Sequence, residues 1–283
     1  MKTIFFGGSS FVIPIIDVLK RNFGLTLVVV KNENDPVINY CKLNDIEFEI
    51  NSYLKYAEEE AQEGGTQIMN KKVDVGVVAD YGVYIPDEVS SFYPKGILNI
   101  HPSFLPKYKG PTPVQTAIFS GESKTGVTII KIDSQIDHGP IIAQKECEIL
   151  ENETSFDLLK KLFSHGASIL QEALPKYING EIIPKAQDGS KATITRILTK
   201  NDGFIDMQNL PDLSKLNLMI RAFYPWPGTW TMTDVNKSSQ KIIKFLPNKH
   251  IQVEGKKEMS YKDFLNGYPE ASLKLRMFLQ QYA

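Results

Sequence analysis

The chain has 283 residues and a net charge of −1, with 42% hydrophobic and 23% charged residues. This composition is typical of one large or two ordinary folded domains and excludes extensive disorder. No apolar run approaches the roughly 20 residues of a membrane helix, and the apolar part of "MKTIFFGGSSF" is too short for a signal peptide. The two cysteines, Cys41 and Cys147, offer neither a disulfide framework nor metal spacing, so we expect small buried hydrophobes in a cytoplasmic protein.

The first hundred residues alternate apolar, β-branched runs with segments of helical spacing. The apolar runs predict buried strands at Thr3–Phe6, Leu25–Val30, Glu47–Ile50, Asp74–Ala79 and Gly96–Ile100. The segments between them predict three helices. The first is Phe11–Arg21, and the third lies within residues 53–70. The second runs to about Asn44, with Asp35 as its N-cap and Pro36 as its first helical residue. This alternation indicates βαβ units and an α/β fold with a mostly parallel, Rossmann-like sheet.

The middle of the chain changes its pattern. A helix is predicted at residues 114–121, followed by longer alternating runs, Thr125–Ile132 and Pro140–Ile149, that we expect to pair antiparallel. A long helix from Ser155 to about Asn179 opens with a Thr154 cap and Asp157 three residues later. Its expected buried stripe consists of Phe156, Leu159, Leu162, Phe163, Ala167 and Leu170.

The remainder of the chain is polar at first and then rich in turns. Residues 181–203 predict a linker between a catalytic domain, 1–180, and a small β-rich, truncated barrel-like domain, 204–283. From Lys200 onward there are 12 Lys or Arg against 8 Asp or Glu, so this part is basic. Its lysines gather in one stretch, as Lys237, Lys241, Lys244, Lys249, Lys256, Lys257 and Lys262. The cluster favours a polyanionic partner, although a solvated lysine face would give the same pattern.

Two kinds of cofactor site are disfavoured by the motifs. The turn "FFGGSSF" is not G-x-G-x-x-G, and the following strand ends in Val30-Lys31 without an acidic residue, which argues against a nicotinamide cofactor. None of the four histidines forms a zinc-binding spacing. Convergence of His101, Asp137 and His138 would still permit a metallohydrolase.

Asn99, His101 and Asp137 form the strongest chemical signal. Asn99 and His101 lie two residues apart at the end of a predicted strand, so their side chains point the same way. Asp137 lies in a loop that can meet them, since ligands gather beyond the carboxyl ends of such strands. An amide donor, an imidazole and a carboxylate together suit acyl transfer to an amine. A structural histidine next to a proline would fit the same spacing.

The residues around this trio resemble a known family. "NIHPSFLPKYKGPTPVQTAIFSGESKTGVTI" together with "IDHGPII" resembles the folate-dependent formyltransferases, and "FFGGSSFVIPIIDVL" resembles their opening strand, turn and helix. The resemblance implies 10-formyltetrahydrofolate as formyl donor, no metal, and Asn99, His101 and Asp137 as catalytic residues. It also implies a folate pocket lined by the turn Ser103, Phe104, Leu105 and Pro106, by Tyr84 and Ile85 of "VVADYGVYIPDEV", and by Ile136.

The C-terminal part resembles one branch of that family. "MIRAFYPWPGTW" and "VEGKKEMSYKDFLNGY" are similar to segments of the enzymes that formylate methionyl-tRNA. This similarity implies that the acceptor is the amino group of initiator methionyl-tRNA. The basic cluster would then bind the phosphates of that tRNA, through Lys241, Lys244, Lys256 and Lys257. Lys107 and Lys109 are expected as rim charges near the folate tail or an acceptor phosphate.

Departures from the family pattern keep other acceptors open. "KNENDPVINY" is short where the tRNA enzymes carry a long basic insertion, and Lys31 is its only base. A nucleotide-linked amino-sugar N-formyltransferase is therefore the alternative, and a formyltetrahydrofolate hydrolase is a third hypothesis. A folate-binding module without catalysis is disfavoured because all three reacting residues are present. His138 stands where a small residue is frequent in the family.

Overall fold

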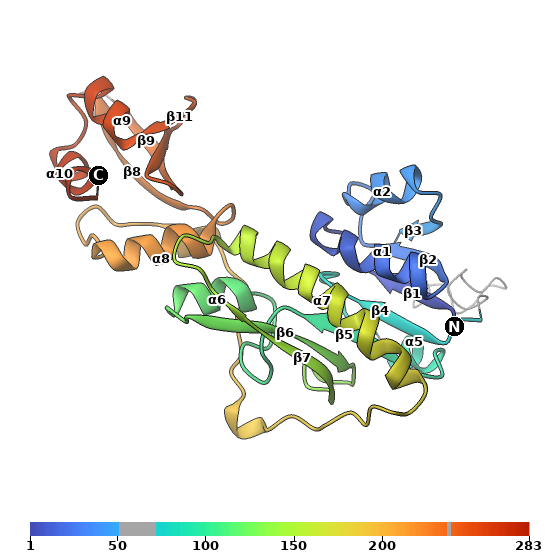
Figure 1. Cartoon of the computed structure of the whole chain (residues 1–283). Helices are drawn as coiled ribbons and strands as arrows, with labels where there is room; N and C mark the ends of the chain where they lie inside the picture. Colours follow the sequence, from blue (N-terminus) through green and yellow to red (C-terminus); the bar gives the residue numbers. More distant parts are fainter. Residues whose placement is uncertain (51–71, 86, 237–238, 283) are drawn as a thin grey trace. The chain divides into compact units, whose positions relative to one another are not determined.

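The computed structural model describes residues 1–50, 72–85, 87–236 and 239–282 (Figure 1). The predicted helix within residues 53–70 lies outside this range. The chain divides into two compact units. The first unit is Met1–Pro113, Lys124–Glu148 and Leu159–Thr195, and the second unit is Val114–Ser123, Ile149–Leu158 and Arg196–Ala283. Among the described helices, none is long and apolar enough to cross a membrane.

The first unit is built on a seven-stranded sheet, in the order β3-β2-β1-β4-β5-β6-β7. Its strands are β1 (Thr3–Phe6), β2 (Leu25–Val30), β3 (Phe48–Ile50), β4 (Val75–Val78), β5 (Ile97–His101), β6 (Lys124–Lys131) and β7 (Ile141–Glu148). The first five are parallel, whereas β6 pairs antiparallel with both β5 and β7. The predicted α/β class, the mostly parallel sheet and the antiparallel pair are confirmed.

The strand order explains where a ligand would meet this sheet. The chain builds outward from β1 to β3, then crosses to the other side of β1 and builds outward again from β4 to β7. In open α/β sheets, ligands bind beyond the carboxyl ends of the strands near such a reversal. Asn99 and His101 end β5, the second strand beyond the reversal, on that same edge.

Helices lie between these strands in the chain and after the last of them. They are η1 (Ser10–Val12), α1 (Ile13–Asn22), α2 (Val37–Leu43), α5 (Asp87–Ser91) and the long α7 (Ser155–Ile178), with the short η2 (Gly189–Lys191) after it. The predicted Asp35 cap is wrong, because Pro36 is the N-cap of α2. The Asp35 carboxylate instead accepts the N–H groups of Lys31 (2.8 Å) and Asn32 (3.1 Å), so it closes the turn after β2.

The cysteines lie where the sequence placed them. Cys41 and Cys147 are both buried and unbonded to one another. Burial raises the pKa of the Cys41 thiol to about 11, so this thiol is neutral and unreactive near pH 7. Both side chains therefore act as small hydrophobes.

The capping box predicted for α7 is confirmed. The Thr154 hydroxyl accepts the Asp157 N–H (3.3 Å), and the Asp157 carboxylate accepts the Thr154 N–H (3.2 Å). Further along α7, a Cβ atom at Gly166 would lie 2.6 Å from Cγ2 of Ile100, so the absence of a side chain there lets α7 approach β5 closely.

Most of the predicted stripe on α7 is buried, but its first member is wrong. Leu162, Phe163, Ala167 and Leu170 are buried, whereas Phe156 is 41% exposed. The fully buried residue of the first turn is Leu158. That turn belongs to the second unit, so contacts there, and not the sheet, decide which side chain is covered.

The second unit contains a separate antiparallel sheet, which confirms the β-rich C-terminal part. Its strands are β8 (Thr229–Asn236), β9 (Ser239–Leu246), β10 (His250–Val253) and β11 (Glu258–Ser260), in the order β11-β10-β9-β8. Within the described residues this sheet is an open meander and not a closed barrel. The helical elements of this part are η3 (Lys200–Gly203), α6 (Pro113–Phe119), α8 (Leu213–Phe223), α9 (Tyr261–Gly267) and α10 (Leu273–Tyr282).

The prediction of short β-like runs alone after residue 201 is incomplete. In α8, Leu216, Met219, Ile220 and Phe223 recur with helical spacing and are all buried. The Asp212 carboxylate caps this helix by accepting the Lys215 N–H at 2.7 Å. The buried apolar face and the N-cap together favour a helix here, although turn residues flank it on both sides.

Replacing Leu170 by alanine should test the packing of α7. This leucine is fully buried, so Leu170→Ala leaves a cavity and should lower the free energy of unfolding by about 2–5 kcal/mol. Urea unfolding followed by circular dichroism measures the change. The neighbouring Gln171→Ala is the control, because Gln171 is exposed. Equal stability of the two variants would contradict the packing of α7.

Candidate active site

Asn99 and His101 come to one side of the sheet because β5 alternates. Leu98 and Ile100 point the other way and are fully buried, with Ile100 against α7. His101 is only 4% exposed, and Asn99 is partly exposed. The end of β5 therefore presents an amide and an imidazole side by side.

Asp137 lies between β6 and β7 and meets both side chains. Asn99 Nδ2 donates to Asp137 Oδ1 at 2.9 Å, and His101 Nδ1 lies 3.4 Å from Asp137 Oδ2. The backbone N–H of Gly110 donates to the same Oδ2 at 2.7 Å. The structure thus brings the three residues of the sequence-derived trio together around one carboxylate, 38 residues away from Asn99 in the chain.

The hydrogen-bond partners of His101 and Asn99 indicate which of their N–H groups can donate to a substrate. His101 Nε2 faces the carbonyl of Tyr108 at 2.9 Å, and a carbonyl only accepts, so Nε2 carries a proton. Nδ1 faces a carboxylate, so the ring can donate to both neighbours only as an imidazolium. At 3.4 Å the contact of Nδ1 is long for a hydrogen bond, which makes Nδ1 the more available nitrogen. Asn99 keeps a second N–H beyond the one given to Asp137.

Asp137 adopts an unusual backbone conformation. Its φ is +49°, in the left-handed region, which costs an L-residue roughly 1–2 kcal/mol. Asp tolerates this region better than most residues, yet the conformation persists only when neighbouring contacts hold it. The position of the carboxylate therefore depends on what fixes the loop.

The turn Ser103–Pro106 is fixed to β6 by Thr128. The Thr128 hydroxyl donates to the Ser103 carbonyl (2.7 Å) and accepts the Leu105 N–H (3.1 Å). Ser103 and Leu105 are buried, and the Ser103 hydroxyl donates to the Lys107 carbonyl at 2.7 Å. Ser103 and Leu105 thus shape the turn, whereas Phe104, 40% exposed, is its outward side chain.

The other residues expected to line the folate pocket also include both exposed and buried side chains. Tyr84 is 60% exposed and Ile136, next to Asp137, is 74% exposed. Ile85 is only 8% exposed and packs in a core cluster with Tyr81 and Val89. Ile85 therefore supports its loop and offers little surface to a ligand.

Two charged neighbours of the trio differ from the sequence-derived picture. His138 Nδ1 bonds Asp133 Oδ2 at 2.8 Å, so His138 pairs with Asp133. In the described part of the chain, no three His, Cys, Asp or Glu side chains gather as metal ligands. Lys109 is only 7% exposed, so the expectation of a rim charge is wrong for this residue, whereas Lys107 is exposed.

The stretch after α7 runs along the site. Its backbone pairs with Ile141 at Lys185 and with Lys109 at Ile194. Gln187 donates to the carbonyls of Asp137 and Gly139. Residues 181–203 looked like a linker because they are polar and broken by Gly and Pro, and a single sequence holds no signal for these contacts. Tyr108, Gly110 and Thr128 were missed for the same reason.

The four lysines proposed for the acceptor lie in the second unit. Lys241 and Lys244 are three apart on β9, so they point to opposite faces of the sheet. Lys256 and Lys257 are exposed on the turn between β10 and β11, beside Glu254 and Glu258. Cross-strand pairing places Gln252 opposite Lys244, and Gln252 Nε2 donates to the Lys256 carbonyl. Lys237 of the same cluster lies outside the described residues.

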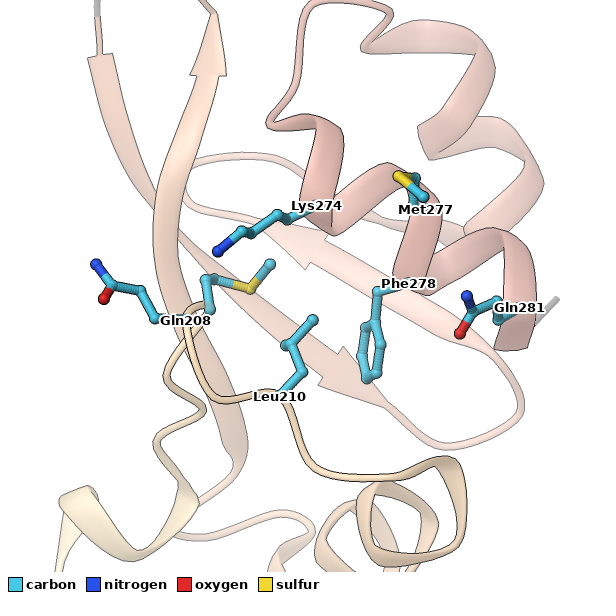
Figure 2. A pocket seen from close by; sticks show the side chains of 7 residues that line it. Gln208, Leu210, Lys274, Met277, Phe278 and Gln281 are labelled. Atoms are coloured by element: carbon cyan, nitrogen blue, oxygen red, sulfur yellow. The ribbon is translucent and has the colours of Figure 1, made fainter.

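Figure 2 shows a pocket in the second unit. It encloses about 250 Å³ and is lined by Met207, Gln208, Leu210, Lys274, Met277, Phe278 and Gln281. Its lining is mainly apolar, and it contains neither Asn99, His101 and Asp137 nor the four lysines proposed for the acceptor.

Comparison with known proteins places these features in a family. The family described as "Formyl transferase" matches residues 1–174. The methionyl-tRNA formyltransferase of Chloroflexus aurantiacus is 48% identical over 158 residues, which cover 56% of this chain and 50% of that protein. The chain thus spans about half the length of the first curated relatives that it matches.

Other similarities extend further along the chain. The methionyl-tRNA formyltransferase of Caldanaerobacter subterraneus subsp. tengcongensis is 28% identical over 314 positions, which cover 96% of this chain and 99% of that protein. The crystal structure of a 4-N formyltransferase from Francisella tularensis has a TM-score of 0.69 at 17% identity and covers 88% of this chain and 98% of its own. The family match covers more than half of the chain and includes β5, the Ser103–Pro106 turn and Asp137. The chain therefore belongs to the formyl transferase family.

Proposed function

We propose that this protein transfers the formyl group of 10-formyltetrahydrofolate to an amine, and that the amine is the amino group of initiator methionyl-tRNA. The observation that carries the proposal is the convergence of Asn99, His101 and Asp137 at the carboxyl edge of the sheet. We also propose a cytoplasmic location, because the two cysteines, Cys41 and Cys147, offer no disulfide framework.

Each member of the trio has a distinct role in this reaction. As the amine attacks the formyl carbon, negative charge develops on the formyl oxygen. The second N–H of Asn99 and the Nδ1–H of His101 donate to that oxygen. The Asp137 carboxylate accepts the proton that the attacking amine loses. When the tetrahedral intermediate collapses, the bond between the formyl carbon and the folate nitrogen breaks, and that nitrogen takes up the proton and leaves as tetrahydrofolate.

The residues beside the trio fit a folate. A pteridine-like ring system needs apolar surface close to a few fixed polar groups. Phe104 and Ile136 supply exposed apolar side chains on the two loops that flank the trio. Because Thr128 fixes the 103–106 turn, that surface is held in place before a ligand arrives. We assign Tyr84 to the same pocket, with Ser103, Leu105, Pro106 and Ile85 as the supporting frame.

The choice of methionyl-tRNA rests on the relatives and on charge. Relatives named methionyl-tRNA formyltransferase match this chain, one of them across nearly its whole length. The basic residues of the second unit suit a phosphate backbone. Among them we assign the exposed pair Lys256 and Lys257 the larger role, with Lys244 on the neighbouring strand and Lys241 on the opposite face.

A nucleotide-linked amino sugar is the second candidate acceptor. The connection between β2 and α2 spans only residues 31–36 and contains one base, Lys31. A small acceptor would need no longer basic loop there. Hydrolysis of the formyl donor is a third outcome, in which water replaces the amine.

A panel of acceptors should decide between these candidates. Initial rates are measured with 10-formyltetrahydrofolate as donor and with methionyl-tRNA, dTDP-amino sugars, UDP-amino sugars or no amine. We expect the highest rate with methionyl-tRNA. A preference for an amino sugar would overturn the acceptor assignment, and formate release without any amine would support the hydrolase.

Replacing the trio should abolish transfer while the fold persists. Asn99→Ala, His101→Ala and Asp137→Ala each remove a donor or a proton acceptor, so each should lower kcat about 100- to 10,000-fold. The same acceptor assay measures the loss, with circular dichroism as the check on folding. Near-normal turnover of any one variant would remove that residue from its role.

Changing the exposed lysine pair should weaken tRNA binding and its salt dependence. In Lys256→Glu/Lys257→Glu, the slope of log affinity against log salt concentration should become shallower by about 1.5–2, because two phosphate contacts are lost. Fluorescence anisotropy with methionyl-tRNA between low and moderate salt measures the slope. Lys160→Glu, on the exposed face of α7, is the control. A wild-type affinity that does not change with salt would contradict the assignment.

A further inference from the structure

Gln187 makes an unusual contact with the loop that carries Asp137. Its Nε2 donates to the carbonyl of Asp137 at 2.8 Å and to the carbonyl of Gly139 at 2.9 Å. One side-chain amide therefore spans both ends of the Asp137–Gly139 segment, from a position 50 residues further along the chain.

The chemistry of these partners fixes the orientation of the Gln187 amide. Both partners are carbonyl oxygens, which only accept, so the NH₂ group must face them and the reversed amide would place three oxygens together. The Gln187 Oε1 atom is buried and has no hydrogen-bond partner among the described residues. A buried acceptor without a partner is unfavourable, so the two donated bonds have to outweigh that cost for this orientation to persist.

The loop needs such a restraint. Asp137 has a φ of +49°, and in that conformation its carbonyl accepts a hydrogen bond from Gln187. Next to it, the backbone at Gly139 is pressed against β6, since a Cβ atom there would lie 1.7 Å from the Lys131 carbonyl oxygen. Gly139 is thus confined by packing as well as by Gln187, and Asp137 is held by Gln187.

The stretch that contains Gln187, residues 185–195, also bonds the loop 108–112, which supplies the other hydrogen-bond partners of the trio. The Lys109 N–H donates to the Thr193 carbonyl (2.9 Å), and the Tyr108 N–H donates to the Thr193 hydroxyl (2.8 Å). The Thr195 hydroxyl donates to the Lys109 carbonyl (3.0 Å) and accepts the Thr112 N–H (3.1 Å). These contacts flank Tyr108, whose carbonyl bonds His101, and Gly110, whose N–H bonds Asp137.

We propose that the segment 185–195 is a positioning strap of the active site and that Gln187 is a positioning residue for Asp137. The strap bonds both loops around the trio and touches none of its three side chains in the contacts described above. This inference deepens the proposed formyl transfer, because it assigns to Gln187 the placement of the carboxylate that the reaction uses.

Two Gln187 variants test the strap. Gln187→Met keeps the size of the side chain and removes both donors, and Gln187→Glu turns the amide donor into an acceptor facing two carbonyls. Both should lower kcat about 10- to 100-fold, since a small displacement of a reacting group has an effect of that order. The KM for 10-formyltetrahydrofolate should stay within about threefold, because the 103–106 turn is anchored by Thr128 and not by Gln187.

A spectroscopic readout separates this inference from the proposed function. The ¹⁵N signals of the His101 ring report on its contact with the Asp137 carboxylate, so they should move in both Gln187 variants even if the acceptor is misassigned. Ile194→Ala is the control, because Ile194 lies on the strap between Thr193 and Thr195 with its side chain 84% exposed. That variant should keep the wild-type rate and His101 signals.

Several results would overturn the proposal. Unchanged His101 signals in both Gln187 variants would show that Gln187 does not position Asp137, whether or not the wild type transfers formyl groups. A kcat within twofold of an active wild type would do the same. Loss of the folded state in both variants, monitored by circular dichroism, would make Gln187 a structural residue only. An inactive wild type with shifted His101 signals in the variants would reject the proposed function and keep the strap.

Discussion

The arrangement of the site depends on the contacts that the Asp137 carboxylate makes. This carboxylate receives hydrogen bonds from the Asn99 amide and the Gly110 backbone and lies 3.4 Å from the His101 ring. These donors come from β5 and from the loop that follows it, whereas Asp137 comes from the loop between β6 and β7. One carboxylate thus joins two loops that the chain order keeps apart.

The fold delivers this arrangement in stages. The alternation of β5 turns Asn99 and His101 to one side while Ile100 packs under α7. The antiparallel pairing of β6 beside β5 brings the following loop to the same edge. The left-handed backbone at Asp137 then aims the carboxylate inward, and the segment after α7 bonds that loop from outside.

The proposed chemistry and the proposed acceptor rest on different units of this protein. The trio, the Thr128-anchored turn and the exposed Phe104 lie in the first unit, on strands that fit the family pattern from residue 1 to 174. The lysines assigned to the acceptor lie in the second unit, on an open four-stranded sheet where β9 sends Lys241 and Lys244 to opposite faces. A dispersed set of charges suits an extended polyanion better than a single small anion, because a phosphate backbone can meet several lysines along its length.

The sequence by itself determined the class of the fold and pointed to the three side chains that the structure brings together. Uninterrupted apolar runs such as Leu25–Val30 indicate strands buried on both faces, and the spacing of Asn99 and His101 shows that they share a side. These signals are local, because hydrophobic periodicity and strand alternation act within a few residues. The same local reasoning placed the Thr154 cap of α7 correctly and missed α8, whose periodicity lies among turn residues.

Only the tertiary structure decided how those side chains are held. The burial of Lys109, the pairing of His138 with Asp133 and the exposure of Phe156 depend on which elements pack nearby. Gln187 gives the plainest case. Its stretch has the composition of a linker, yet its amide spans two carbonyls of a loop 50 residues earlier in the chain. Such bonds join a side chain to a backbone group of any residue type, so the amino-acid sequence leaves no mark of them, and they exist only once the sheet has brought the two segments together.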